Sequence, residues 1–503
     1  MLQPFGSRPS FIARLAAIHK FRPAMLQIHP GSKIGSTSEP TLRHGALGLL
    51  DSVVMAVAGS APAYSITAST AALAAAVGIA GPAAITMAFL PMIGITLAFS
   101  YLNRWRSEAG AGYSWIGRAI NPSLGFLAGW ALLSLSTIFN VVAALSAGEA
   151  TLELLSPGAH HDPLSATIIG AIWFLGVLAV VTCGITATAK MQVVLTLLEV
   201  GSVVAVCGFA IIVTRAAPAA TFSWSWFSPT TFGSFETFSA GMLVAVFYFC
   251  GWDVSANLAE ETANSESSSG HAGVAGVTVI FILFLLAQVS IQMALTPDQI
   301  QANAANLLPA LGHLTLGAPW SAVAVLAVMV SSVATIQTQL VQCSRLLFAM
   351  ARDKVIGPSM GHLHPRFQTP WLAGFTVAAV SLPVFIASAM VPAVNDLMSD
   401  LINAIGIQAS FYYVLAALAC VFYYRRVLFA DWQTLIFAGA LPLFSAFFVA
   451  GVVICELPQL GYRVSGVSIG AILTGLVPLL YYRRLYKSRF YTDPREAAPP
   501  RSQ

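Results

Sequence analysis

Long apolar stretches separated by short polar segments follow one another along almost the whole chain. A helix that crosses a membrane needs about 20 consecutive, mainly apolar residues. Windows of this kind predict about twelve membrane-spanning helices and no soluble domain, which makes the predicted fold class an all-α membrane protein. The predicted spans are 48–76, 81–101, 122–148, 164–187, 190–214, 236–262, 272–296, 318–350, 371–391, 396–424, 432–456 and 465–483.

The composition supports this assignment and narrows the chemistry. Of the 503 residues, 57% are apolar and 9% are charged, whereas roughly a quarter of a soluble domain is charged. The six cysteines lie within or at the ends of spans without paired spacing. We interpret them as small apolar residues rather than as disulfide partners or metal ligands. The chain also lacks a metal-ligand spacing of His, Cys and carboxylate residues, so we expect no metal, no cofactor and no enzymatic activity.

The positive charges predict the orientation of the chain. If the N-terminus lies inside, all of the 24 Lys and Arg residues except Arg215 and Arg463 fall in cytoplasmic segments, as the positive-inside rule requires. We therefore expect a multi-pass protein of the cell (inner) membrane with both termini in the cytoplasm. Because these cations serve the topology, we expect the lipid bilayer and no nucleic acid as a partner.

Four parts follow from this pattern. The first forty residues have cations but no apolar core like that of a secretory signal. The predicted parts are a cytoplasmic arm at 1–44, a ten-helix core at 45–424, two further helices at 425–485 and a cytoplasmic tail at 486–503.

The first span contains a predicted break at the stretch Ala58-Gly59-Ser60-Ala61-Pro62-Ala63. Pro62 has no N–H and clashes with the preceding turn, so a regular helix does not continue through it. Proline suits the first position of a new helix, whose free N–H groups near Ala63 carry partial positive charge and favour a carboxylate. A packed proline kink without a ligand is the alternative interpretation.

A second predicted break lies five spans later, where Cys250, Gly251 and Asp253 interrupt span six. A carboxylate at membrane depth has to face protein or water, and a broken helix is tolerated where it lines a cavity or packs inside protein. Two breaks five spans apart are typical of transporters built from inverted repeats, with the site at mid-membrane. Asp253 has three possible roles: a helix cap, a counter-charge for an ammonium group, or a proton-coupling carboxylate.

Other polar residues inside spans are candidates for coupling or binding. Glu199 lies near the middle of span five, where it is either a proton carrier or a neutral carboxyl bonded to a neighbouring span. Span eight has Ser331, Ser332 and Thr335, and span three has Thr137 and Asn140. These groups either line a path for ion or substrate or bond one helix to another, and we favour the second role for most of span eight.

Four stretches together resemble the amino acid–polyamine–organocation transporter superfamily. They are Gly59–Pro62, Glu108–Tyr113, Phe249–Asp253 leading to Glu260-Glu261, and Arg345 leading to Arg352-Asp353. The resemblance covers residues 48–424. It implies a five-plus-five inverted repeat with discontinuous helices one and six and two added helices, and it implies secondary transport of amino acids or amines by alternating access.

The resemblance also implies roles for particular residues. The backbone of Ala58–Ala63 would bind the carboxylate and the amine of a substrate. Phe247 matches an aromatic gate, Phe249 is the fallback, and Asp253 matches a position that is acidic in many polyamine and amino acid carriers. Glu199 departs from the family, because proton-coupled relatives often have a cation there. Pro62 replaces part of the usual Gly-x-Gly pattern, as in polyamine and broad amino acid permeases.

The resulting hypothesis is a transporter of an amino acid or small amine by proton-coupled symport, with a proton favoured over sodium. The small-molecule substrate would lie between the breaks, with Phe247 and Tyr248 closing over it, and Glu199 would exchange the proton. The first alternative keeps the fold and makes the protein an obligate exchanger. The second is a membrane sensor that binds an amino acid without moving it.

Overall fold

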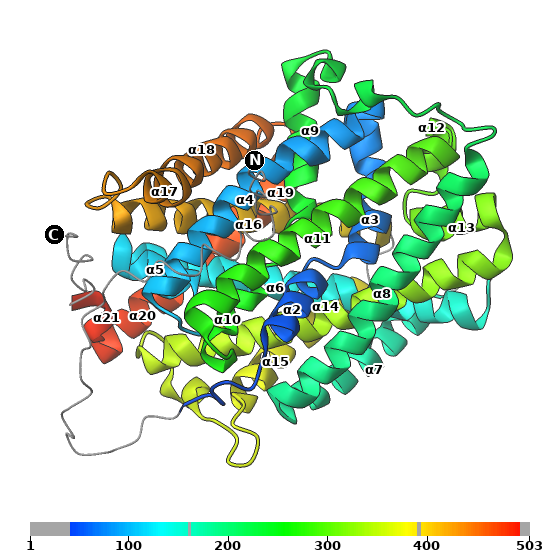
Figure 1. Cartoon of the computed structure of the whole chain (residues 1–503). Coiled ribbons are helices and arrows are strands. Elements are labelled where there is room, and N and C mark those ends of the chain that lie inside the picture. The colour runs from blue at the N-terminus through cyan, green and yellow to red at the C-terminus, as the bar shows by residue number, and fades with distance from the viewer. Residues whose placement is uncertain (1–40, 159–161, 390–393, 493–503) are drawn as a thin grey trace, which may run out of the picture. The chain divides into compact units, whose positions relative to one another are not determined.

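The helices follow the predicted order of spans (Figure 1). The computed structural model describes residues 41–158, 162–389 and 394–492, without the side chains of residues 247, 386–404 and 463. Most of the predicted arm and the end of the predicted tail therefore lie outside the described residues. Within the described ranges the regular secondary structure is helical, and β-structure is limited to one isolated bridge between Leu47 and Thr262.

Each predicted span corresponds to a helix or a pair of helices. Spans one to five are α2 (Leu49–Gly59) with α3 (Pro62–Val77), α4 (Gly81–Trp105), α6 (Pro122–Leu155), α7 (Pro163–Thr182) and α8 (Ile185–Thr214). Spans six to ten are α9 (Phe235–Tyr248) with α10 (Val254–Asn257), α11 (Ser265–Ala294), α14 (Ala318–Arg352), α15 (Trp371–Ala389) and α16 (Val394–Tyr424).

The last two spans and four short helices complete the chain. Span eleven is α17 (Trp432–Thr434), a π-helical turn (Leu435–Ala440) and α18 (Leu441–Glu456), and span twelve is α19 (Gly461–Thr474) with α20 (Leu476–Tyr486). The short helices are α5 (Gly112–Ala119), α12 (Pro297–Ala302), α13 (Leu307–Leu316) and α21 (Arg489–Thr492).

Length and hydropathy confirm an all-α, multi-pass membrane protein. Among the described residues, nine helical segments are long and apolar enough to cross a membrane, and one of them, Leu49–Trp105, contains the first two spans. Shorter apolar helices represent spans six and nine. Helix α13 was not predicted from the sequence, because its ten residues are too few for a span and lie between the predicted spans 272–296 and 318–350. The internal symmetry of the two five-helix halves stays a prediction.

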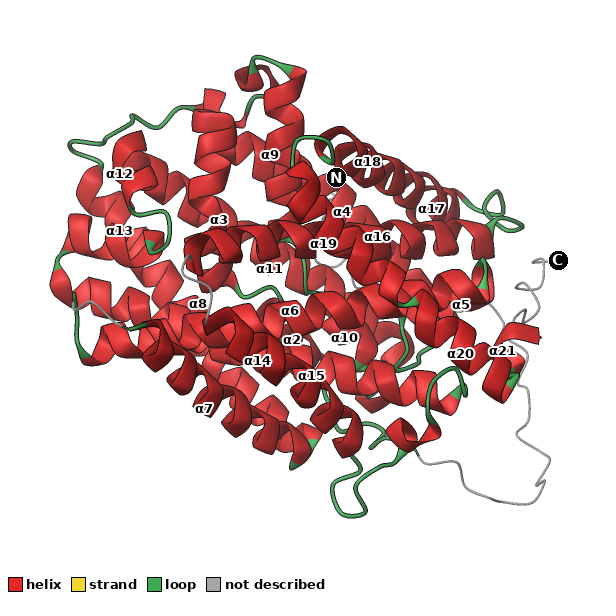
Figure 2. Cartoon of the chain, turned by 180° about the vertical axis from the view of Figure 1, so that it is seen from behind, coloured by secondary structure: helices red, strands yellow, loops and turns green. Residues whose placement is uncertain are grey.

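Inner and outer helices differ in what surrounds them. Helix α14 is buried along most of its length and packs against α6, α8 and α13, while α11 packs against α4, α2 and α8. Figure 2 shows α7 on the outside of the bundle. There and on α8, large apolar side chains such as Ile172 and Leu197 are about two-thirds exposed, at 65% and 66%. A lipid environment suits that surface, and the broken helices α2/α3 and α9/α10 stay inside protein.

The start of the predicted tail packs against the helical core. Phe490 of α21 is buried and stacks on Tyr113 with ring centroids 5.0 Å apart. Its ring lies over Gly117, where a Cβ would be 2.3 Å from a ring atom. This contact joins the end of the described chain to α5.

Candidate functional site

The first helix break is at the predicted residues. Helix α2 ends at Gly59 and α3 begins at Pro62. Between them Ala61 has φ 47° and ψ 60°, a left-handed conformation that is uncommon for a residue other than glycine. The proline removes one backbone donor, and the left-handed residue turns the chain. Together they separate the span into two half-helices.

The second break is longer and less regular than the sequence suggested. Helix α9 ends at Tyr248, and the chain then forms only the four-residue α10 and a short 3-10 turn at Ala259–Glu261. Gly251 has φ +100°, a region that is costly for any residue with a Cβ. The segment after the break is therefore a run of short turns instead of a second long half-helix.

The two breaks contact each other through two glycines. A Cβ on Gly59 would lie 2.2 Å from the carbonyl oxygen of Gly251, and a Cβ on Gly251 would lie 2.0 Å from the carbonyl oxygen of Gly59. Any larger residue at either position would overlap the opposite backbone. Hydrogen atoms in place of side chains thus allow the main chains of spans one and six to meet inside the membrane domain.

A small cavity lies beside this glycine contact. Its volume is about 20 Å³, which is room for about one water molecule. The lining residues are Gly59, Leu132, Leu135, Phe139, Cys250, Gly251, Asp253, Gln339, Gln342, Ile405, Ala409, Tyr412 and Tyr413. Asp253 is the one acidic side chain in this lining. A molecule larger than water would fit there only if the surrounding helices separated.

Asp253 is buried and held by uncharged groups. The hydroxyl of Tyr413 donates to Oδ1 at 2.7 Å, and the side-chain amide of Gln342 donates to Oδ2 at 2.8 Å. Tyr413 also accepts the N–H of Gly251 at 3.1 Å. The side chain of Asp253 forms no cap on α10, so the structure does not support the cap interpretation. The carboxylate is fixed against the second break without a neighbouring cation in the cavity lining.

A second buried carboxylate holds the first break. Glu199 is fully buried, and its Oε1 accepts the N–H of Ala63 at 3.0 Å, while Oε2 has no hydrogen-bond partner. Ser331 accepts the next N–H, that of Tyr64, at 3.2 Å. The hydroxyl of Thr335 donates to the carbonyl of Ala58 at 3.2 Å. Spans five and eight thus meet the half-helix α3 at its N-terminus.

Several other predicted residues lie outside the cavity lining. Tyr248 bonds Thr70 at 2.7 Å, and Phe249 packs edge-on against Phe284. Thr137 donates to the carbonyl of Leu133 in its own helix, and Ser332 donates to Ser146. Asn140 lines a separate cavity of about 10 Å³ between α6, α7 and α15. The side chain of Phe247 lies outside the described residues, and Ser60 is buried with its hydroxyl unpartnered.

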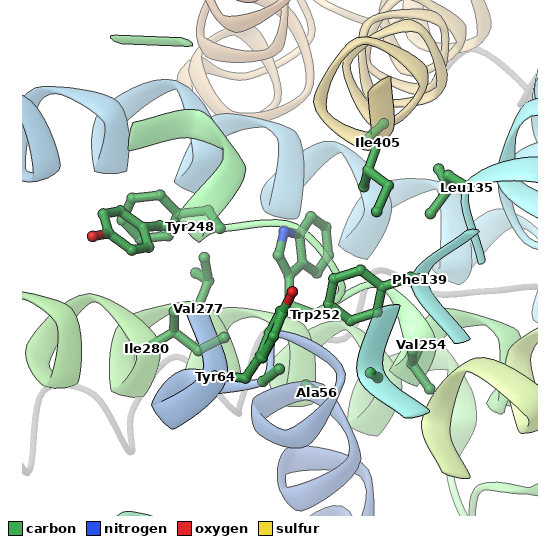
Figure 3. Close-up of a cluster of buried hydrophobic side chains, with 14 of the residues drawn as sticks. Ala56, Tyr64, Leu135, Phe139, Tyr248, Trp252, Val254, Val277, Ile280 and Ile405 are labelled. Atoms are coloured by element: carbon green, nitrogen blue, oxygen red, sulfur yellow. The ribbon is translucent and has the colours of Figure 1, made fainter. Parts of the chain in front are cut away.

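The cavity also contains side chains that the sequence did not single out. Tyr412 and Tyr413 come from α16, Gln342 from α14 and Phe139 from α6. Figure 3 shows Phe139 beside Tyr64 and Trp252 near the break, and the rings of Phe139 and Tyr64 meet edge to face with centroids 5.9 Å apart. Tyr412 and Tyr413 follow the polar residues Gln408 and Ser410 in span ten. Polar side chains at these positions inside a span were the sequence feature that could have indicated the two tyrosines.

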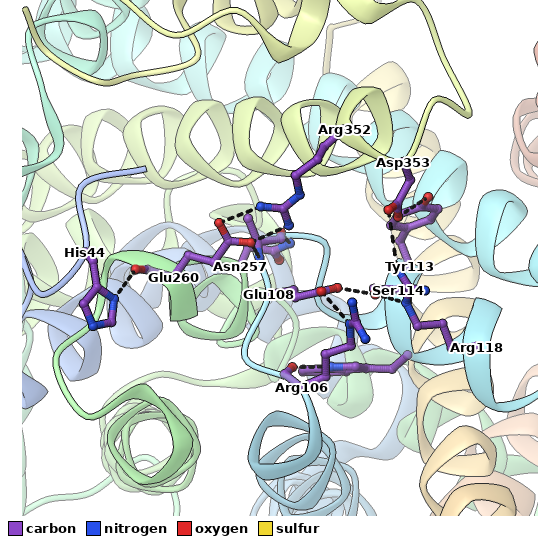
Figure 4. Close-up of polar contacts among 12 residues, drawn as sticks. His44, Arg106, Glu108, Tyr113, Ser114, Arg118, Asn257, Glu260, Arg352 and Asp353 are labelled. Carbon is purple, nitrogen blue, oxygen red and sulfur yellow. Dashed lines mark hydrogen bonds and ion pairs between the residues drawn. The ribbon is translucent and has the colours of Figure 1, made fainter. Parts of the chain in front are cut away.

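The remaining stretches of the resemblance gather at the end of the bundle predicted to face the cytoplasm. Arg345 binds both oxygens of Glu261, at 2.9 and 3.2 Å, and each side chain is 1% exposed. Arg352 binds both oxygens of Glu260, at 2.6 and 3.0 Å. We call these four residues the arginine–glutamate network (Figure 4 shows the Arg352–Glu260 pair).

Helix α5 contacts Asp353, the residue that follows Arg352 of this network. Tyr113 donates to Asp353 at 2.9 Å, and Arg118 contacts the same carboxylate at 3.3 Å (Figure 4). Burial raises the pKa of Asp353, and the Arg118 guanidinium opposes that shift. The N–H of Ala109 donates to Glu260 at 2.9 Å. The loop before α5, the turn after α10 and the end of α14 are therefore tied together by charged hydrogen bonds.

Comparison of the sequence with known proteins identifies the family of the chain. The chain is 22% identical over 311 residues to the low-affinity putrescine importer PlaP of Escherichia coli, an alignment that covers 60% of this chain and 66% of that protein. It is 26% identical over 308 residues to the branched-chain amino acid permease BcaP of Lactococcus lactis, covering 58% and 64%. The aligned part spans slightly less than two thirds of each relative. Residues 47–477 match the family described as amino acid permease, and the chain therefore belongs to that family.

Proposed function

We propose that this protein is a secondary active transporter that moves an amino acid or a small amine by alternating access. The observation that carries the proposal is the contact between Gly59 and Gly251 beside a cavity that contains the buried carboxylate of Asp253. Two interrupted helices that meet inside a membrane domain are the usual setting of a substrate site in transporters. The family and the two relatives named above support the same class of function.

The substrate would bind between the breaks through its ammonium group. Asp253 would supply the counter-charge, with Tyr413 and Gln342 orienting it. Backbone carbonyls of Ala58–Ala63 and of Cys250-Gly251 complete the proposed site for an ammonium group. One relative is named for putrescine and the other for branched-chain amino acids, so both an amine and an amino acid belong in the first tests.

The proposed coupling ion is a proton. Glu199 is fully buried, and one of its two oxygens has no partner, so the side chain can take up a proton without losing its bond to Ala63. Because the carboxylate contacts the first turn of α3, protonation would weaken its attraction to the partial positive charge at the N-terminus of that half-helix. Ser331 and Thr335, which touch the same break, would hold the neighbouring backbone.

The proposed orientation places both termini in the cytoplasm of a cell with the protein in its inner membrane. In that orientation the arginine–glutamate network closes the cytoplasmic side of the site, and the small cavity leaves no room for substrate. Transport would then require the network and the helices around the cavity to separate in turn.

Uptake into proteoliposomes tests the proposal. Purified protein would be reconstituted without internal substrate and supplied with labelled putrescine or leucine, with and without an inward proton gradient. Accumulation that depends on the gradient is the expected result. Uptake that requires preloaded substrate would instead indicate an obligate exchanger. Binding without movement of label under either condition would contradict transport and favour a sensor.

A further inference from the structure

The first turn of α3 has no backbone donor left for a ligand. A helix N-terminus normally leaves its first N–H groups unpaired, and a substrate carboxylate is a natural partner for them. Pro62 has no N–H. The three donors that follow are engaged: Ala63 with Glu199 at 3.0 Å, Tyr64 with Ser331 at 3.2 Å, and Ser65 with the Ala61 carbonyl at 2.7 Å. The anion position at this half-helix is therefore filled by the chain's own Glu199.

The peptide groups inside the break are also engaged. The N–H groups of Ser60 and Ala61 donate to the carbonyls of Val57 and Ala58, both at 3.1 Å. A carboxylate that entered the break would have to displace one of these bonds or the Glu199 side chain. Displacement of Glu199 would leave its buried carboxylate without the N–H of Ala63 as donor, which is costly.

The charges around the site disfavour a third carboxylate. The two buried acids at the breaks are Glu199 and Asp253, and no Lys or Arg lines the central cavity among the residues that the structure describes. Arg345, at the end of the bundle, is already bound by both oxygens of Glu261. An α-amino acid would thus bring its carboxylate toward two acids and no free cation, whereas an ammonium group alone would be attracted by both.

We propose that this site takes amines that have no carboxylate in preference to the corresponding α-amino acids. Glu199 stands in for the substrate carboxylate at α3, and Asp253 binds the ammonium group. The inference rests on the proposed function, because it specifies the substrate class of the same site. The apolar lining from Leu132, Leu135 and Ile405 suits the hydrocarbon part of such an amine.

Matched pairs of ligands that differ by one carboxylate test this preference. Isoamylamine is leucine without its carboxylate, and putrescine is ornithine without its carboxylate. Each would be titrated against the full chain in detergent by thermal shift and then used as a competitor in the uptake assay. The amine of each pair should act at a concentration at least about tenfold lower than the concentration at which the amino acid acts.

The possible outcomes separate the two levels of the proposal. Equal or tighter binding of leucine and ornithine would overturn the amine preference and leave the transporter proposal intact. The absence of any thermal shift or competition from all four compounds would contradict the proposed function itself.

A substitution at Glu199 tests its role directly. Glu199→Ala frees the N–H of Ala63 and removes one acid, so it should reduce the amine-to-amino-acid affinity ratio by about tenfold. Glu199→Gln is the matched control, because its amide oxygen can still accept from Ala63 and keep the position filled. It should retain more of the preference than the alanine variant does. An unchanged affinity ratio in Glu199→Ala would overturn the role of Glu199 as a stand-in for the substrate carboxylate. If that variant does not fold, titration of the ligand pairs against the wild-type protein still tests the amine preference.

Discussion

Two pairs of acids in this protein are held in opposite ways: Glu261 and the partly buried Glu260 at one end of the bundle, and the buried Glu199 and Asp253 at the helix breaks. In the arginine–glutamate network, Glu260 and Glu261 each receive two charged hydrogen bonds from an arginine. At the helix breaks, Glu199 and Asp253 are held by peptide, hydroxyl and amide groups. Both arrangements give the carboxylates hydrogen-bond donors, although Oε2 of Glu199 has none, and only the first pairs each carboxylate with a positive charge.

This difference separates a structural site from a site that is ready to bind. A buried ion pair with both partners hydrogen-bonded gains little from another charge. A buried carboxylate held by neutral donors stays electrostatically open to a cation or a proton. The comparison therefore predicts that changes in the network act on stability and gating, whereas changes at the breaks act on ligand affinity.

The largest effect is expected from breaking the most buried ion pair. Arg345→Gln leaves Glu261 charged and unpaired at 1% exposure, and removal of one partner of such a pair costs about 3–5 kcal/mol. The free energy of unfolding in detergent, measured by titration with a denaturing surfactant, should fall by that amount. The double variant Arg345→Gln/Glu261→Gln removes both charges and should recover much of the loss. A double variant as unstable as the single one would show that charge pairing is not what holds this end together.

The next largest effect is expected at the glycine contact. Gly251→Ala places a Cβ 2.0 Å from the carbonyl oxygen of Gly59 at a φ of +100°, and such backbone strain costs about 1–3 kcal/mol before any overlap is relieved. Because the two breaks would move apart, putrescine uptake should fall by about tenfold or more. Gly201→Ala in α8 is the control, since nothing lies within 4 Å of its Cβ. Equal uptake by the two variants would argue against the contact as part of the site.

The breaks could be predicted from sequence because their causes are local. Pro62 lacks a backbone donor in any context, and Gly251 two residues before an intramembrane carboxylate indicates an interruption by itself. The residues that bind Asp253 are a different case. Tyr413 and Gln342 come from spans ten and eight, at separations of 160 and 89 residues from Asp253, and only the packing of whole helices decides which of their faces reaches the site.

The aromatic residues show the same limit within a single helix. Tyr248 and Phe249 stand three and two residues before Gly251 in the chain, yet they contact Thr70 and Phe284. Neighbouring residues on a helix point in directions about 100° apart, so proximity in sequence does not identify the ring that covers the cavity. Among the described side chains, the aromatic rings that line the cavity are those of Phe139, Tyr412 and Tyr413, from two other helices.

A smaller effect is expected from removing the charge at the second break. Asp253→Asn keeps an oxygen that can accept from Tyr413 and loses the attraction for an ammonium group. A hydrogen bond to a charged group is worth about 1.5–3 kcal/mol, so the affinity for putrescine should fall by about 10- to 100-fold. The thermal midpoint without ligand should change little in comparison with Arg345→Gln. Unchanged putrescine affinity would remove Asp253 from the binding site.

The smallest effect is expected at the hydroxyl that orients this carboxylate. Tyr413→Phe removes the bonds of 2.7 Å to Asp253 and 3.1 Å to Gly251 but keeps the ring that stacks on Trp252. Because Tyr413 would orient the carboxylate and would not bind the ammonium group itself, putrescine affinity should fall by only roughly two- to tenfold. In the Asp253→Asn background the same substitution should have less effect, because the carboxylate it orients is already gone. Titration of the four proteins with putrescine measures this coupling, and additive losses would mean that Tyr413 acts on the second break through Gly251 instead of through Asp253.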